Sequence, residues 1–350
     1  MDESRNSTRI GLHGVGSVGR HVARLLLDHR PGIEVVGAST LEAADVGRPL
    51  HEVAGANADS SCLVTGSLHE VLAAEPDLVV LSTGSFLPDV AEDVLTCIGA
   101  GASVVSPCEE LAYPARKDPA LAERIDEAAR SAGVSVLGTG ISPGFLFDSL
   151  LCAASGACWD ISAIRGRRVV DVVGFGENIH LRLGIGYTHE QFTRGHREGT
   201  IAGHVGFPET IAMVCRRFGL ELDEPVEQLF EPMIAETPAP TRYGEVKPGY
   251  TEGFVHRAIG RVGGEEFIKF ELLLHLRPEH AGFRATDSLE IEGIHPVRLT
   301  LDPGMSPLFA TAAMLVNSIP ALRAFAPGLK AVTDLPAAAW IADFGSIRLS

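Results

Sequence analysis

A glycine-rich turn between a short apolar run and a helical pattern constrains the fold of this chain more than any other feature. Ile10 and Leu12 belong to the apolar run, and the turn that follows reads Gly14-x-Gly16-x-x-Gly19. The first glycine permits a tight turn, the second lets a pyrophosphate approach the backbone, and the third lets the helix pack closely on the strand. The stretch therefore predicts a dinucleotide cradle at the start of a parallel α/β sheet.

The same motif occurs in ordinary glycine-rich turns, and its position decides between the two interpretations. Here it follows a strand-like segment and opens a helix-like one, which favours cofactor binding. The predicted cofactor contacts in this turn are Gly14, Val15, Gly16, Ser17, Val18, Gly19 and Arg20.

Strand-like and helix-like segments alternate up to about residue 137. Strands are expected at 33–38, 63–65, 78–81, 102–106 and 134–137, and helices at 68–74, 87–100 and 118–132. The unbroken apolar run at 78–81 is typical of a strand covered on both faces. These repeated units predict an α/β fold with a Rossmann-type, doubly wound parallel sheet.

The second expected strand ends at Ser39 and Thr40, where an acidic residue would hydrogen-bond the ribose hydroxyls of NAD. The lack of an acid there removes the repulsion that a 2′-phosphate would meet, and Arg20 or Arg48 could supply positive charge. We therefore expect NADP as the cofactor. If Glu42 bends back to the ribose, NAD is possible instead.

Two further loops follow expected strands at the edge where open α/β sheets bind ligands. Ser82, Thr83 and Gly84 follow the strand at 78–81, and Cys108 follows the strand at 102–106; all four are predicted cofactor contacts. Two adjacent carboxylates, Glu109 and Glu110, come next. They either stabilise a helix N-terminus or place one carboxylate at the nicotinamide pocket, and spacing alone leaves both interpretations open.

Beyond about residue 150 the pattern changes. Strands are expected at 161–164, 168–173, 254–262, 266–276, 287–292 and 297–301, with helices at 148–157, 206–218 and 306–318. Alternating residues indicate an antiparallel sheet with one exposed face, which makes a homodimer plausible. We expect a dinucleotide-binding domain at 1–145, with about 305–350 packing back onto it, and an α+β substrate and oligomerisation domain at 146–304.

Composition argues against several classes of protein. The formal charge of −16 disfavours nucleic-acid binding, and no apolar run reaches the length of a membrane span. The polar N-terminal segment is unlike a signal peptide, so we expect a cytoplasmic protein. Six cysteines without a CxxC pair signal neither a metal site nor a disulfide framework.

Several segments resemble the 2,4-diaminopentanoate dehydrogenase and native amine dehydrogenase family, whose fold is like that of dihydrodipicolinate reductase. These are GLHGVGSVGR near the start, DVGRPLHEVAG at 45–55, SPCEELAYP at 106–114, GTGISPGF at 138–145, GHVGFPET at 203–210 and ATAAMLVNSIPAL from 310. The resemblance implies a nicotinamide-dependent oxidoreductase that reversibly deaminates a primary amine. In the other direction it would aminate an aldehyde or ketone with ammonia.

The resemblance also implies roles for individual residues. Glu109 would be the catalytic carboxylate, which holds ammonium, accepts a proton and stabilises an iminium cation. Glu110 is the alternative, because adjacent side chains usually point to different sides. Ser142 and Pro143 match the turn near the nicotinamide and are predicted cofactor contacts.

Four residues are candidate substrate contacts besides Glu110. Phe147 and Asp148 match pocket-lining positions, and Asp148 would either bind a second ammonium or serve as a helix cap. Arg168 matches an arginine that faces the pocket in relatives, or it belongs to a solvated basic patch. His256 is the fourth candidate, although a histidine on a strand is more often structural.

Other activities remain as alternatives. Dihydrodipicolinate reductase is disfavoured, because the stretch 176–180 has one histidine and no nearby lysine. The remaining alternatives are 2,4-diaminopentanoate dehydrogenase proper, a carbonyl or imine reductase, and a non-catalytic NADP-binding protein.

Overall fold

The computed structural model describes residues 7–201 and 203–346, which form two compact units. Unit 1 is built from the described parts of Met1–Leu150, Ala212–Arg217 and Ser306–Ser350. Unit 2 is built from the described parts of Leu151–Ile211 and Phe218–Met305. The C-terminal segment therefore clusters with the N-terminal part of the chain.

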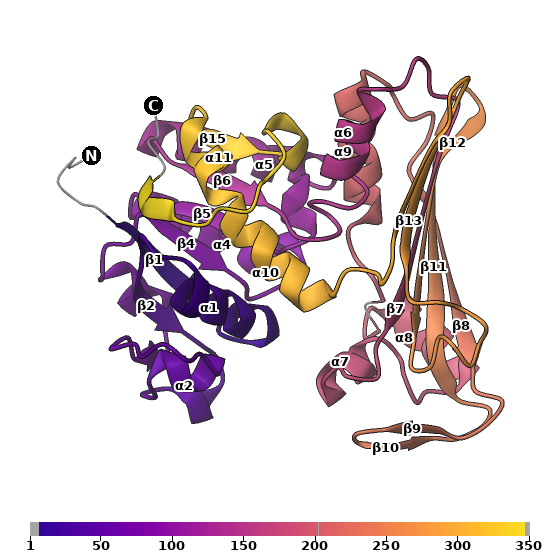
Figure 1. Cartoon of the computed structure of the whole chain (residues 1–350), viewed down its shortest axis with the longest axis horizontal. Coiled ribbons are helices and arrows are strands. Elements are labelled where there is room, and N and C mark those ends of the chain that lie inside the picture. The colour runs from indigo at the N-terminus through magenta and orange to yellow at the C-terminus, as the bar shows by residue number, and fades with distance from the viewer. Residues whose placement is uncertain (1–6, 202, 347–350) are drawn as a thin grey trace. The chain divides into compact units, whose positions relative to one another are not determined.

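A seven-stranded parallel sheet forms the centre of unit 1, in the order β15-β6-β5-β4-β1-β2-β3 (Figure 1). Its strands are β1 (Thr8–His13), β2 (Ile33–Ser39), β3 (Val64–Thr65), β4 (Leu78–Leu81), β5 (Ser103–Ser106), β6 (Ser135–Gly138) and β15 (Gly328–Lys330). The predicted doubly wound sheet is confirmed. Its strand order reverses between β1 and β4, and ligands of such sheets bind at the carboxyl ends beside this point.

Helices cover both faces of this sheet because each strand alternates its apolar side chains between the two faces. They are α1 (Ser17–His29), α2 (Leu50–Ala54), α3 (Leu68–Leu72), α4 (Leu87–Gly99), α5 (Pro119–Ala132), α10 (Pro307–Asn317) and α11 (Ile319–Ala324). Leu12 and Val80 pack in one core with α1 and α10, whereas Val79 and Leu81 pack in the other with α4 and α5. Two buried layers thus fix the strand ends that carry the cradle.

Unit 2 contains a six-stranded sheet in the order β14-β13-β7-β12-β11-β8. Its strands are β7 (Ala163–Asp171), β8 (Glu227–Ile234), β11 (Thr251–Val262), β12 (Glu265–His275), β13 (Asp287–Glu292) and β14 (Val297–Leu301). The expectation of a wholly antiparallel sheet is wrong at one place, since β7 and β12 pair in parallel. Two strands expected at 161–164 and 168–173 are the single strand β7, which is continuous through Arg165, Gly166 and Arg167.

Unit 2 also contains helices and a two-stranded sheet. They are α7 (Glu177–Arg182), α8 (His189–Glu198), and the short paired strands β9 (Ala239–Thr241) and β10 (Gly244–Val246). Two more helices, α6 (Ser149–Ser155) and α9 (Phe207–Phe218), contain residues of both units. None of the helices within residues 7–201 and 203–346 has the length and apolarity needed to cross a membrane.

Candidate cofactor and active site

Each of the three positions in the cradle requires glycine for a different structural reason. Gly14 has φ +99°, and a Cβ there would press on the carbonyl of Ser82; a Cβ on Gly19 would press on the carbonyl of Gly14. At Gly16 a Cβ would meet no other atom within 4 Å. The outer two glycines are therefore needed for the packing of the loop itself, and the middle one leaves the space that a close-approaching ligand requires.

The N-terminus of α1 suits an anion. Gly16 is the N-cap, no side chain caps the helix, and its first turn contains no acidic residue. The first N–H groups of a helix lack intrahelical acceptors, and the helix dipole adds partial positive charge there. A pyrophosphate fits this helix start, as the sequence motif predicts.

Hydrogen bonds hold the cradle against β2 and β4. The backbone N–H groups of Gly14 and Val15 both donate to the carbonyl of Ser39 at 3.0 Å. The Ser82 hydroxyl donates to the carbonyl of Gly14 at 2.7 Å. The loop is thus fixed from both neighbouring strands.

Buried hydroxyls without partners lie in the loops after β4 and β6. Within the described residues, Thr83 Oγ1, Thr139 Oγ1 and Ser142 Oγ are buried and have no hydrogen-bond partner. An unpaired buried hydroxyl is costly, so such groups usually await a ligand or water. Thr83 and Ser142 are predicted cofactor contacts, and their free hydroxyls fit a polar cofactor; Pro143 follows Ser142 through a cis peptide bond.

Ser39 and Thr40, the residues expected at the ribose, are buried and already make hydrogen bonds within the protein. The Ser39 hydroxyl lies 2.7 Å from His13 Nδ1, and Thr40 Oγ1 accepts a hydrogen bond from the N–H of Glu42. Arg20 and Arg48 both bind Asp45, at 2.5 and 3.0 Å. Asp45 was not predicted as part of this region, and it offsets part of the positive charge expected for a 2′-phosphate.

The two adjacent carboxylates after β5 have different environments. Glu110 is 4% exposed; its Oε2 accepts a hydrogen bond from the N–H of Leu87 at 2.7 Å, and its Oε1 pairs with Lys117. Glu109 is half-buried and is the N-cap of the 3-10 helix Glu110–Ala112. Glu110 therefore has a structural role at the start of α4. Cys108 is fully buried, and burial raises the pKa of its thiol to about 12.

Asp148 and Phe147 are fully buried. The Asp148 carboxylate accepts hydrogen bonds from the N–H groups of Gly144 and Ser149, each at 2.6 Å. Burial raises the pKa of this carboxyl to about 6, and the backbone hydrogen bonds oppose the shift. These hydrogen bonds tie the carboxylate to the loop at Gly144 and to the first residue of α6, and they give no support to a role in binding a second ammonium.

A row of register partners across the sheet of unit 2 contains both basic substrate candidates. From β13 to β8 the row is Asp287, Arg168, Leu272, His256 and Phe230. Residues at the same register share a face of the sheet, so these side chains point to the same side. Arg168 and His256 therefore lie on the same face, on strands separated by β12, although they are 88 positions apart in sequence.

Arg168 is 3% exposed and is not part of a solvated basic patch. Its Nη2 donates to the carbonyl of Met305 at 2.6 Å, and its Nε lies 3.7 Å from Asp287. Nη1 is buried and has no acceptor in the described part of the chain. A buried guanidinium N–H without an acceptor is the kind of group that a ligand oxygen satisfies.

His256 is completely buried and stacks on Phe230 at 3.9 Å between ring centroids. Neither ring nitrogen has a hydrogen-bond partner among the residues described. Burial, together with His204 and His196, lowers the pKa of His256 to about 2, so the ring is neutral. A neutral imidazole can offer one donor and one acceptor to a ligand.

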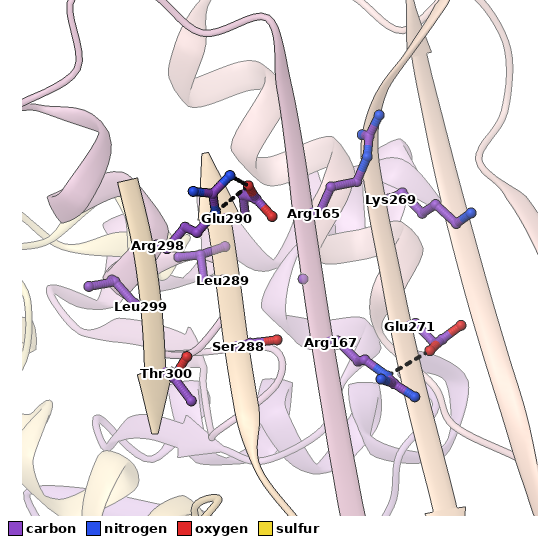
Figure 2. A pocket seen from close by; sticks show the side chains of 11 residues that line it. Arg165, Arg167, Lys269, Glu271, Ser288, Leu289, Glu290, Arg298, Leu299 and Thr300 are labelled. Carbon is purple, nitrogen blue, oxygen red and sulfur yellow. Dashed lines mark hydrogen bonds and ion pairs between the residues drawn. The ribbon is translucent and has the colours of Figure 1, made fainter. Parts of the chain in front are cut away.

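The other face of this sheet carries a shallow hollow of about 400 Å³ above Gly166 (Figure 2). Its rim is charged: Arg167 pairs with Glu271 at 2.9 Å, and Arg298 pairs with Glu290 at 2.6 Å. Lys269 also lines the hollow. This face has no residue that the sequence singled out for chemistry.

The cradle, the strand order and the loops at the carboxyl edge define a dinucleotide-dependent dehydrogenase fold. The family model of the 2,4-diaminopentanoate dehydrogenase C-terminal domain matches residues 145–348, and the chain belongs to this family.

Named relatives agree with this assignment. A 2,4-diaminopentanoate dehydrogenase of Acetoanaerobium sticklandii is 38% identical over 234 residues, which is 67% of this chain and 66%, just under two thirds, of the relative. An amine dehydrogenase structure from Mycobacterium smegmatis superposes with a TM-score of 0.86 at 25% identity, covering 96% of this chain and 98% of that one. An apo scyllo-inositol dehydrogenase from Lactobacillus casei (TM-score 0.53, 15% identity, 93% and 91% covered) shares the fold alone.

Proposed function

We propose that the protein is an NADP-dependent amine dehydrogenase that interconverts a primary amine with a carbonyl compound and ammonia. The observation that carries the proposal is the position of Glu109, which is half-buried in the loop after β5. The neighbouring Glu110 is buried and binds Leu87 and Lys117. Parallel strands place the loops after β1, β4, β5 and β6 at one edge of the sheet. The acid and the cofactor cradle thus belong to the same edge.

The chain's residues bind, orient and move protons, because the nicotinamide cofactor, when bound, supplies or accepts the hydride. The glycine loop and the α1 N-terminus hold the pyrophosphate, and Thr83 and Ser142 offer hydroxyls to the rest of the cofactor. Glu109 holds ammonium and accepts its proton, so that neutral ammonia can attack the carbonyl carbon. It then returns a proton to the hydroxyl of the carbinolamine, which leaves as water, and its carboxylate stabilises the iminium cation that results. The same carboxylate assists water in the reverse direction.

We propose Arg168 and His256 as substrate contacts, with Phe147 contributing apolar surface. Their buried unpaired atoms, Arg168 Nη1 and the two ring nitrogens of His256, support the assignment. A free guanidinium N–H favours a substrate that carries a carboxylate. The second candidate function is therefore oxidation of 2,4-diaminopentanoate, the compound named for the relative, rather than of a simple amine.

The catalytic assignment is tested with Glu109→Gln. NADPH oxidation is followed with a panel of aldehydes, ketones and keto acids, with and without excess ammonium. The wild type should require ammonium, and the variant should lose amination by at least about 100-fold while its NADPH affinity stays nearly unchanged. Glu92→Gln, an exposed carboxylate on α4, is the matched control. Full activity of Glu109→Gln would contradict the role of Glu109, and wild-type turnover without ammonium would indicate a carbonyl reductase.

We also propose that the protein is a homodimer and is located in the cytoplasm. Charges of both signs lie on the sheet face of unit 2 that carries the hollow, where Arg257 binds Glu271 at 2.8 Å beside the apolar residues Val255 and Leu273. Such a face can pair with its own copy about a two-fold axis. Six free cysteines suit a reducing compartment. Light scattering should give a dimer that Lys269→Glu with Arg298→Glu weakens; a monomer at all concentrations would contradict the proposal.

A further inference from the structure

We propose that His13 and Asp93, which lie outside the glycine motif, position the dinucleotide cradle through Ser39 and thereby set the affinity for the cofactor. The inference rests on the proposed cofactor binding and assigns two positioning residues to it. Ser39 itself is then a positioning residue as well, rather than a hydrogen-bond donor to the ribose.

Three elements of unit 1 meet in this arrangement. His13 is the last residue of β1 and is the register partner of Ser39, the last residue of β2. His13 Nδ1 lies 2.7 Å from Ser39 Oγ, and His13 Nε2 lies 3.2 Å from the Oδ2 of Asp93 on α4. The chain Ser39–His13–Asp93 thus links both strands beside the cradle to a helix on one face of the sheet.

The carboxylate decides the tautomer of the imidazole. Asp93 can only accept, so the Nε2 of a neutral His13 carries the hydrogen and donates it. Nδ1 is then a bare acceptor, and the Ser39 hydroxyl donates to it. Burial lowers the pKa of His13, against the opposing effect of Asp93, which supports the neutral form at physiological pH. Each of the three groups therefore has a defined role and one orientation.

Ser39 transmits this orientation to the cradle. Its carbonyl accepts hydrogen bonds from the N–H groups of both Gly14 and Val15 at 3.0 Å. Its hydroxyl is held by His13, so the backbone and the side chain of Ser39 are both fixed by the segment that contains the cradle. Ser39 is completely buried, which prevents its hydroxyl from turning to solvent. Binding geometry that must hold to about 0.5 Å depends on such supporting hydrogen bonds.

The arrangement also reassigns the donor at the ribose position. The hydrogen of the Ser39 hydroxyl is committed to His13, so Ser39 cannot donate to a phosphate or a ribose. Thr40 Oγ1 accepts from the N–H of Glu42 at 3.2 Å and keeps its own hydrogen for a donor role. Thr40, not Ser39, is therefore the hydroxyl that can donate to the cofactor here.

Cofactor affinity is the direct test. NADPH and NADH binding to the full chain is measured by fluorescence titration for the wild type, His13→Ala, His13→Asn and Asp93→Asn, together with KM and kcat. His13→Ala should weaken binding and raise the cofactor KM by about 10-fold or more, while kcat at saturating cofactor changes by less than about 3-fold. His13→Asn should recover part of the affinity, because its amide oxygen can accept from Ser39.

The controls separate this inference from the proposed function. Glu92→Gln, on the same helix and exposed, should bind like the wild type. If His13→Ala does not fold, Asp93→Asn, which preserves volume, must still weaken binding measurably. Equal affinities in the wild type, the His13 variants and Asp93→Asn would overturn the inference and leave cofactor binding intact. If the wild type binds neither nucleotide, the proposed function fails instead.

Discussion

Glu110 and Leu87 are 23 positions apart in sequence, and the carboxylate of Glu110 accepts the backbone N–H of Leu87, the first residue of α4, at 2.7 Å. The N-cap residue of this helix is Phe86, whose side chain makes no capping hydrogen bond. A carboxylate from a neighbouring loop therefore provides the cap, and the Lys117 ammonium binds its other oxygen. This contact joins the loops after β4 and β5.

Replacing Glu110 by Gln should therefore reduce stability more than chemistry. The amide keeps one acceptor, but it loses the charge that pairs with Lys117 and the charge-assisted bond to Leu87. We expect a loss of about 1–3 kcal/mol in the free energy of unfolding, measured by urea titration. Glu109→Gln is the internal comparison, because it should keep stability and lose amination. The reverse pattern would exchange the roles of the two residues.

Asp148→Asn should also destabilise unit 1. Both carboxylate oxygens accept backbone N–H groups in a fully buried site, from Gly144 and Ser149. The amide nitrogen of Asn would face one of these donors, which leaves that N–H without an acceptor and costs about 1–3 kcal/mol. Thermal unfolding followed by circular dichroism measures the loss. A variant that keeps its stability but loses activity only toward diamines would show instead that Asp148 binds a second ammonium.

The parallel sheet of unit 1 was predictable because its signals are local. Apolar runs such as 78–81 indicate the strands, and the glycine motif indicates the turn at the carboxyl edge of the sheet. Neither signal needs information from distant parts of the chain. The short strand β15 was not predictable, since its three residues become a strand only by pairing with β6. Likewise, β7 was expected as two strands, because the run from Arg165 to Arg167 hides its alternation.

The site was predictable only where residue type alone determines the chemistry. The glycine motif and the acidic pair could be found from the sequence, but the burial of Glu110 and its contacts with Leu87 and Lys117 could not. The pairing of His13 with Asp93 was not predictable, because a single histidine before a glycine and an acid inside a helix carry no sequence signal. Their proximity follows from the packing of α4 on the sheet.

Stability should fall on mild acidification through His256. Burial lowers the pKa of this ring to about 2 in the folded state, whereas in the unfolded chain it stays near 6.5. Below pH 6.5 the unfolded state binds a proton that the folded state does not, so stability is full above pH 6.5 and declines as pH decreases. Between pH 7.5 and 5.5 this one group should cost about 1.4 kcal/mol.

The contribution of His256 is isolated with His256→Leu. Urea unfolding at pH 7.5 and 5.5 should give a smaller pH-dependent loss in this variant than in the wild type, by about 1 kcal/mol. His280→Gln, at an exposed position, should behave like the wild type. Identical pH dependence in His256→Leu and the wild type would mean that the histidine becomes accessible to protons in the folded protein.

Cofactor choice should depend on the charge at the end of β2. Thr40→Asp places a carboxylate where the ribose is expected, which would accept both hydroxyls of NADH and repel the 2′-phosphate of NADPH. We expect KM for NADPH to rise by about 10-fold or more and KM for NADH to fall, in the same amination assay. Leu41→Asp is the matched control, because Leu41 is the adjacent residue and is 84% exposed. If both variants shift KM for NADPH equally, general charge repulsion explains the effect. A shift confined to Thr40→Asp would place the 2′-phosphate at this end of β2, close to Arg20 and Arg48, which both bind Asp45.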